Sequence, residues 1–214
     1  MRNDRLLDEL VADLQPVKPR RNRRDLLLLG IIGAIEIGLF LLFGAARHDI
    51  MIAMKLPSFW WKIGSLGTLT ITAGITAVRS FDPSVSPRKG LRLLPSLIAA
   101  ALAIGWVIDA AGAGGAAALW ARLMLHHGID CLFAMVSLSI PAILALGLLM
   151  RRGAPTDRKG SASAVGVASA AWGAFVFVFN CPHDDPFYVA VWYLAGCGIT
   201  TLIARLVLPR MTRW

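Results

Sequence analysis

Six apolar runs, most of them near twenty residues long, recur along the chain and constrain its fold more than any other feature. We place them at about residues 26–46, 63–78, 93–111, 131–150, 161–179 and 189–208. A helix of about 20 apolar residues crosses a hydrocarbon core of ~30 Å. Helices can span lipid because all their backbone hydrogen bonds form within one segment. The sequence therefore predicts an all-α integral membrane bundle of six transmembrane helices.

The composition favours the same class of protein. Of the 214 residues 57% are hydrophobic, and the mean hydropathy is +0.64, which is unusual for a soluble domain of this size. The formal net charge of +9 could indicate a surface that binds nucleic acid. The basic residues instead bracket the apolar runs, as the positive-inside rule expects. We therefore expect a lipid bilayer around the chain and no direct contact with nucleic acid.

Lys and Arg are distributed unequally between alternate connecting segments. Eighteen of the 22 lie in the N-terminal tail, in residues 79–92 and 151–160, and toward the C-terminal end. The segments between them hold only Arg47, Lys55, Lys62 and Arg122. Cytoplasmic loops of bacterial membrane proteins carry the excess of Lys and Arg. The sequence thus predicts a multi-pass membrane protein with both termini in the cytoplasm, which in a bacterium places it in the inner membrane.

The expected organisation has three parts: a cytoplasmic segment at 1–25, a transmembrane domain at 26–208 and a short cytoplasmic end at 209–214. Residues 16–24 form a proline-stiffened basic linker, which the anionic cytoplasmic leaflet attracts. A signal peptide cleaved near residues 44–46 is the alternative interpretation of the first run. That run is longer than the ~7–15 apolar residues of a signal core, so we expect a retained anchor.

The first fifteen residues are polar but follow a helical pattern between a possible cap at Asn3 and a stop at Pro16. One face carries the apolar side chains Leu6, Leu7, Leu10, Val11 and Leu14. The opposite face carries Asp4, Asp8, Glu9 and Asp13 against Arg2 and Arg5. Helices that bind membranes usually have a basic polar face. We therefore expect this short amphipathic helix to dock on a protein with a basic surface; the alternative is packing against the chain's own cytoplasmic loops.

Two cysteines are expected at the periplasmic face, where thiols can be oxidised. Cys131 follows His126, His127 and Asp130, and Cys181 precedes His183, Asp184 and Asp185. Such ligands select soft or borderline cations such as zinc, cadmium or copper, and the metal candidates are Cys131, Cys181, His183 and Asp185. A disulfide is the second possibility if the Cβ atoms come within ~3.5–4.5 Å. The third is two small buried residues beside a solvated loop.

The three cysteines form no C-x-x-C motif, which argues against a zinc finger and against a thioredoxin-type dithiol. Cys197 lies within the last run beside glycines and is expected to pack between helices. The sequence also shows no nucleophile–base pair, phosphate-binding glycine loop or metalloprotease helix. We therefore expect no enzyme, no small-molecule substrate and no resident cofactor beyond a transient soft metal ion.

Glu36 is the acid nearest the middle of a span. An intramembrane carboxylate is a functional hypothesis by default, and we expect it to be neutral because no basic residue lies at matching depth. The hydroxyls of Ser65, Thr68, Thr70 and Thr72 are the expected hydrogen-bond partners. The alternative is a role as a proton relay.

Several short motifs occur in an order that is similar to a known family. They are Arg47-x-Asp49, Phe59-Trp60-x-Lys62, Cys131, Pro141, Arg151-Arg152-Gly153-Ala154-Pro155, Cys181-Pro182-x-Asp184, Trp192-Tyr193 and Arg213-Trp214. Over nearly the whole chain this pattern resembles the NrsF-type family of bacterial inner-membrane anti-sigma factors.

The resemblance implies six spans and a cytoplasmic N-terminal segment that binds an extracytoplasmic-function sigma factor. It also implies two periplasmic cysteines, by position Cys131 and Cys181, that respond to heavy-metal or oxidative stress. His183 and Asp185 lie beside the motif and are not among its sensing residues.

The acidic amphipathic helix suits this partner, since the DNA-facing surfaces of a sigma factor are basic. The rival hypothesis is a small membrane redox protein or metal transporter that uses the same cysteines. The absence of C-x-x-C and of polar residues along several spans counts against it.

Overall fold

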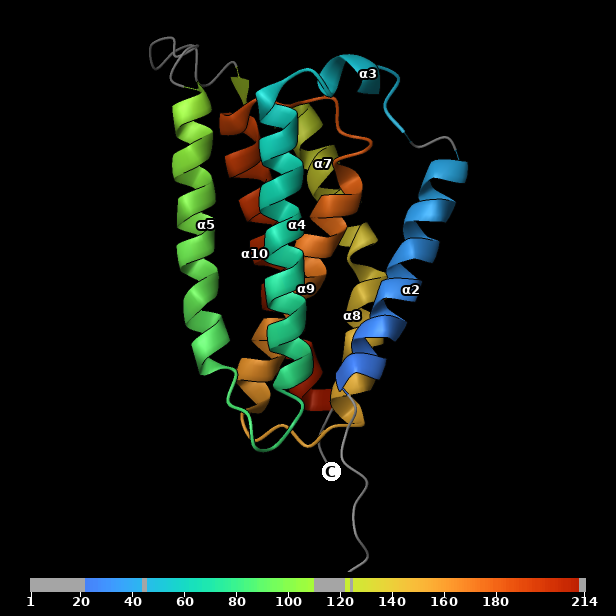
Figure 1. Cartoon of the computed structure of the whole chain (residues 1–214), viewed down its shortest axis with the longest axis vertical. Helices are drawn as coiled ribbons and strands as arrows, with labels where there is room; N and C mark the ends of the chain where they lie inside the picture. The colour runs from blue at the N-terminus through green and yellow to red at the C-terminus, as the bar shows by residue number, and fades with distance from the viewer. Residues whose placement is uncertain (1–21, 44–45, 110–121, 124, 212–214) are drawn as a thin grey trace, which may run out of the picture.

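The computed structural model describes residues 22–43, 46–109, 122–123 and 125–211, and these form a bundle of helices (Figure 1). In chain order the helices are α2 (Asn22–Leu42), α3 (Ile50–Ala53), α4 (Pro57–Arg79), α5 (Arg88–Asp109), α7 (Leu125–Leu138), α8 (Ile140–Arg151), α9 (Arg158–Phe177) and α10 (Pro186–Met211). The described part of the chain contains no strand. The predicted all-α class is confirmed.

Five helical segments are long and apolar enough to cross a membrane: α2, α5, Leu125–Arg151, α9 and α10. They coincide with five of the six predicted spans. The remaining predicted span, 63–78, falls within α4. This helix has 23 residues and is not among these five. Its apolar character is diluted by Lys62 and by threonines, whose hydroxyls bond to carbonyls of the preceding turn, as in Thr76 Oγ1 to the Thr72 oxygen at 2.8 Å. Six spans therefore stay a prediction.

The fourth predicted span differs in its bounds and its continuity. The apolar segment begins at Leu125 rather than at residue 131, so Cys131 lies in the second turn of α7 and not at the end of the span. Ser139 separates α7 from α8, and Pro141 stands in the first turn of α8. Proline has no N–H for the helical ladder, which explains a break at this point.

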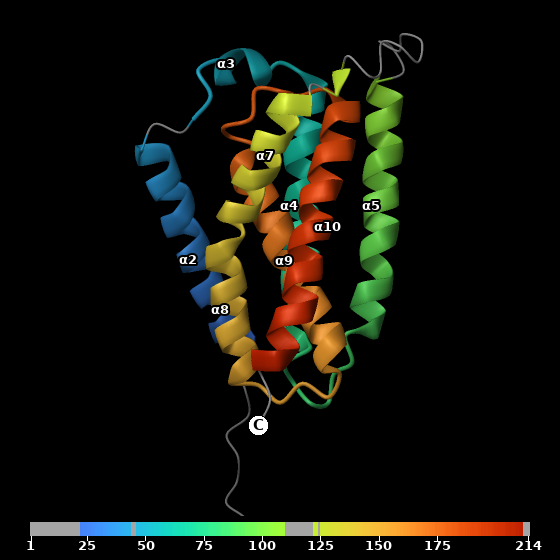
Figure 2. The ribbon, with the colours of Figure 1, turned by 180° about the vertical axis from the view of Figure 1, so that it is seen from behind.

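Helix α9 is the centre of the bundle. In Figure 1 it lies behind α4, and in the reverse view of Figure 2 it lies behind α7 and α10. Its small side chains permit close packing, which is how helices associate in lipid. A Cβ on Gly166 would lie 2.8 Å from the Thr201 Cα, and one on Gly173 would lie 2.6 Å from the Met135 carbonyl oxygen.

Large apolar side chains cover the outside of the bundle. They include Leu27 of α2, Ile71 of α4, Trp106 and Val107 of α5, Phe133 of α7 and Leu202 of α10, all of them exposed. Soluble monomers rarely expose contiguous apolar surface on this scale. The surface is compatible with a membrane protein, in which lipid would cover these side chains.

The connecting segments gather at two opposite ends. The start of α2, residues 80–87 and 152–157 and the end of α10 lie at one end, and α3 with residues 178–185 lies at the other (Figure 1). The two loops predicted to be cytoplasmic thus share one end with the described ends of the chain. We call this the basic end and the opposite one the cysteine end.

Candidate functional site

The two predicted sensing cysteines lie side by side at the cysteine end. Cys131 is on α7, Cys181 follows α9, and their exposed fractions are 7% and 0%. Both are free thiols and belong to one buried cluster, in which each thiol affects the ionisation of the other. The hydroxyl of Tyr188 donates to the Cys131 Sγ at 3.2 Å, and the Cys181 Sγ lies 3.7 Å from the His183 carbonyl oxygen. Residues fifty positions apart thus form one buried pair.

Arg47, in the segment that follows α2, hydrogen-bonds to the segment around Cys181. Its guanidinium donates to both Asp49 carboxylate oxygens at 2.7 Å and to Asp184 Oδ2 at 2.7 Å. It also donates to the carbonyl oxygens of Cys181 at 3.0 Å and Pro182 at 3.2 Å. With its side chain 3% exposed, Arg47 satisfies carbonyls that have no helical partner and so fixes the backbone that carries Cys181.

Lys62 is the second buried cation of the site. It lies on the face of α4 that also buries Phe59 and Leu66, because residues three and four apart share a helix face. Its Nζ donates to the His183 carbonyl oxygen at 2.9 Å, lies 3.4 Å from Asp184 Oδ1 and stands 5.2 Å from the centre of the Tyr193 ring. Asp184 is therefore shared by two cations from different parts of the chain.

The charges around Cys181 favour its thiolate. The hydrogen bond from Cys131 and then the Lys62 ammonium lower the pKa of the Cys181 thiol below its usual range, although burial opposes them. On the opposite side of the cluster, the hydrogen bond from Arg47 lowers the pKa of Asp49 to about 2. The thiolate is the form that attacks oxidants and binds metals. The Lys62 ammonium thus favours the reactive form of Cys181.

Asp185 belongs to a separate ionic cluster. It accepts from Arg122, which also bonds to Asp109 at the end of α5, and it accepts the Phe187 N–H at the start of α10. Burial raises the pKa of Asp185, but the Arg122 hydrogen bond and the backbone N–H groups outweigh it and the pKa is lowered. Asp185 thus caps α10 and holds α5 against it, and its carboxylate is engaged there.

The predicted metal ligands are only partly brought together. Cys131 and Cys181 meet, whereas the His183 ring faces Tyr188 and His127, with ring centres 4.7 and 5.8 Å away. Within the described ranges no group of three or more His, Cys, Asp or Glu side chains is arranged to hold a metal ion. A metal role for Cys131, Cys181, His183 and Asp185 together stays a prediction.

The sequence motifs included Arg47, Lys62 and Asp184, but sequence reasoning did not predict that the three meet beside Cys181. A signal was present: Arg47, Lys62 and Arg122 are three of the four basic residues that depart from the charge rule. Each of them is paired with an acid of the same end. Basic residues on the sparsely charged side of a membrane protein thus pointed to a structured cluster there.

Glu36 has a different partner from the predicted hydroxyls. The indole N–H of Trp172 on α9 donates to Glu36 Oε2 at 2.8 Å. Gly33, one turn earlier on α2, leaves space for this indole, since a Cβ there would lie 2.7 Å from it. The expectation of Ser65, Thr68, Thr70 and Thr72 was wrong because α2 turns this face toward α9.

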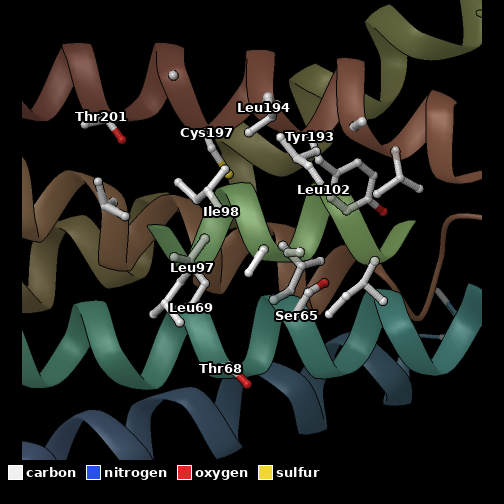
Figure 3. A pocket seen from close by; sticks show the side chains of 18 of the residues that line it. Ser65, Thr68, Leu69, Leu97, Ile98, Leu102, Tyr193, Leu194, Cys197 and Thr201 are labelled. Carbon is white, nitrogen blue, oxygen red and sulfur yellow. The ribbon is translucent and has the colours of Figure 1, made fainter. Parts of the chain in front are cut away.

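Cys197 lies apart from the thiol pair. It lines an apolar cavity of about 760 Å³ between α4, α5 and α10, together with Leu69, Leu97, Ile98 and Leu194 (Figure 3). The predicted partner-binding side chains Leu6, Leu7, Leu10, Val11 and Leu14 lie outside the described residues.

Comparison with known proteins agrees with the motifs gathered at the cysteine end. Residues 10–214 match the family described as NrsF, negative regulator of sigma F. The chain is 30% identical over 219 residues to the anti-sigma-F factor NrsF of Caulobacter vibrioides (strain NA1000 / CB15N), which covers all of both chains. It is 27% identical over 218 residues to the probable anti-sigma-F factor NrsF of Azospira oryzae (strain ATCC BAA-33 / DSM 13638 / PS), again over all of both. No solved structure matches. The resemblance is confirmed, and the chain belongs to the NrsF family of anti-sigma factors.

Proposed function

We propose that this anti-sigma factor resides in the bacterial inner membrane and holds an extracytoplasmic-function sigma factor inactive through its N-terminal segment. Heavy-metal or oxidative stress, sensed by Cys131 and Cys181 at the periplasmic face, releases the sigma factor. The observation that carries this proposal is the contact between two buried thiols from distant parts of the chain. They lie at the end of the bundle opposite the start of α2, where the N-terminal segment is attached.

Both signals use the two sulfurs as a unit. With a hydroperoxide as oxidant, the Cys181 thiolate and the Cys131 thiol form one disulfide. The two electrons released, together with the thiol proton and one proton from solvent, reduce the peroxide to water and an alcohol. With a soft divalent cation, the two sulfurs bind the ion and any thiol proton is released to solvent. Either bond ties α7 to residues 178–185.

The fold offers a route from the thiols to the N-terminal segment. Cys131 lies on α7, α7 leads through Ser139 into α8, and α8 contacts α2. Helix α2 begins at Asn22, within the predicted basic linker of residues 16–24 that follows the predicted sigma-binding helix. A signal can change the affinity for the sigma factor only if the two states of the bundle bind the signal differently. The α7–α8 break gives these helices a place to bend.

Inhibition needs no catalysis. The apolar face of the N-terminal helix would cover a basic surface of the sigma factor that otherwise engages polymerase. Burying one leucine side chain is worth about 1.5–3 kcal/mol, so Leu7 and Leu10 would contribute much of the affinity.

The test is co-purification from the native membrane. The full-length chain should retain a sigma factor, whereas the double variant Leu7→Ala, Leu10→Ala should lose it and raise transcription of the regulon without stress. The matched control Asp8→Asn changes the polar face and should keep the partner. A doubly substituted protein that is present at normal level and still represses would contradict the proposal that this segment binds the sigma factor.

A further inference from the structure

Two imidazoles lie side by side at the cysteine end, one helical turn beyond the buried thiols. His127 of α7 and His183 of residues 178–185 have ring centres 5.8 Å apart. His127 is exposed and His183 is partly exposed, whereas both cysteines are buried. We propose that His127 and His183 form a solvent-facing entry site for a borderline divalent cation such as Zn²⁺, which then passes to Cys131 and Cys181. This inference rests on the proposed function and names the route of its metal signal.

The ring separation fits a shared ion. With zinc–nitrogen bonds of ~2.0–2.1 Å and tetrahedral geometry, two imidazoles on one ion have ring centres roughly 5–6 Å apart. The observed 5.8 Å lies in that range. Imidazole is a ligand that zinc and copper accept readily.

Each imidazole is linked to one of the thiols. His127 precedes Cys131 by four residues, so both project from one face of α7. His183 follows Cys181 by two residues, and its carbonyl oxygen accepts from Lys62 Nζ at 2.9 Å and lies 3.7 Å from the Cys181 Sγ. Tyr188 contacts both the imidazole pair and the thiol pair. Its ring packs on His183, with ring centres 4.7 Å apart, and its hydroxyl donates to the Cys131 sulfur.

The incomplete donor set suits an entry site better than a storage site. Structural zinc sites are closed by four protein ligands, whereas sites that exchange ligands keep open positions for water. Here two imidazoles would hold the ion and solvent would complete its shell. The thiols alone are a poor first contact because both are buried.

Transfer of the metal ion to the sulfurs needs no oxidant, reductant or other co-reactant. The ion leaves two imidazole nitrogens and gains two thiolate sulfurs. Any proton displaced from a thiol passes to solvent or to an imidazole nitrogen that the ion has vacated. Soft thiolates hold zinc, cadmium or copper more strongly than solvent-exposed imidazoles, so the transfer runs inward.

Oxidation of the thiols by a hydroperoxide does not require a metal ligand. Loss of the two histidines should therefore affect the response to metal and not the response to peroxide. In cells, the double variant His127→Gln, His183→Gln should need at least about tenfold more Zn²⁺ for induction, the scale of loss when a metal site is disturbed. Its response to hydrogen peroxide and its repression without stress should equal those of the native protein. His126→Gln is the matched control, since His126 is the neighbouring exposed imidazole of α7, with its ring centre 6.0 Å from that of His127, and it should respond normally to both.

Direct binding gives the second measurement. The full-length protein carrying Cys131→Ser and Cys181→Ser, purified in lipid nanodiscs, should still bind one weakly held Zn²⁺ in competition with a chromophoric chelator. Adding His127→Gln should abolish that binding. A double-histidine variant with an unchanged Zn²⁺ dose response would overturn the entry site and leave cysteine sensing intact. Normal induction of the cysteine variants by both Zn²⁺ and peroxide would instead overturn the proposed function.

Discussion

The guanidinium Nη1 of Arg47 donates to Asp184 Oδ2 at 2.7 Å, and the two side chains are 3% and 6% exposed. The contact joins the segment after α2 to the segment between α9 and α10, 137 residues later in the chain. Helix α2 carries the N-terminal segment, and residues 178–185 carry Cys181. This ion pair therefore links the segment after α2 to the proposed sensor. Its loss should therefore affect both stability and signalling.

Arg47→Met should destabilise the fold by about 1–3 kcal/mol, because it leaves the Cys181 and Pro182 carbonyl oxygens without their donor, while Asp184 keeps Lys62 as a partner. The measurement is unfolding of the purified protein in mixed micelles. The double variant Arg47→Met, Asp184→Asn should lose less than the sum of the two single losses, as residues that act as a pair are not additive. Lys55→Met, at an exposed lysine of the same end, is the control. A loss below 1 kcal/mol for Arg47→Met would show that the pair is not structural.

Lys62→Met should raise the pKa of the Cys181 thiol, because the Lys62 ammonium stabilises the thiolate. The thiolate fraction at a given pH then falls, so the midpoint of alkylation against pH moves upward. Mass spectrometry of iodoacetamide-treated protein resolves Cys181 from the other cysteines without further substitution. Lys55→Met should leave the midpoint in place. An unmoved midpoint in Lys62→Met would mean that Cys131 alone sets the reactivity.

Cys131→Ser and Cys181→Ser should each abolish induction by metal and by peroxide while repression without stress is kept. The double variant should be no worse than either single one, because both signals need a bond to both sulfurs. Cys197→Ser is the matched control, since Cys197 lines the apolar cavity instead, and it should respond normally. The readout is a transcriptional reporter of the sigma factor. Full induction in one of the two single variants would replace the bridging mechanism with a single reactive thiol.

Glu36→Gln should preserve repression and induction, because an amide oxygen can still accept the Trp172 N–H and no charge is needed for that contact. Trp172→Phe removes the donor but keeps a ring beside Gly33, and it should lower stability by about 1–3 kcal/mol, the cost of an unsatisfied buried acceptor. Protein abundance and reporter output are measured together. If Glu36→Gln is abundant but no longer signals, an ionised or proton-coupled carboxylate must replace this structural role.

Apolar periodicity and charge placement by themselves determined the all-helical class, the approximate position of the long helices and the grouping of the loops into two sets. These properties are local, since each depends on about twenty consecutive residues and the charges that flank them. The sequence also identified Cys131 and Cys181 as candidates, through the family resemblance and their position outside the basic segments.

Only the tertiary structure decided which side chains meet. It drew Asp184 into the cluster with Arg47 and Lys62, and it turned Asp185, its neighbour, to Arg122 and the start of α10. It likewise gave Glu36 a partner on α9 rather than on α4. The physical reason is that helix rotation and contact between distant segments set these pairs. Those depend on how small residues such as Gly166 and Gly173 let the helices approach, which no single stretch of sequence specifies.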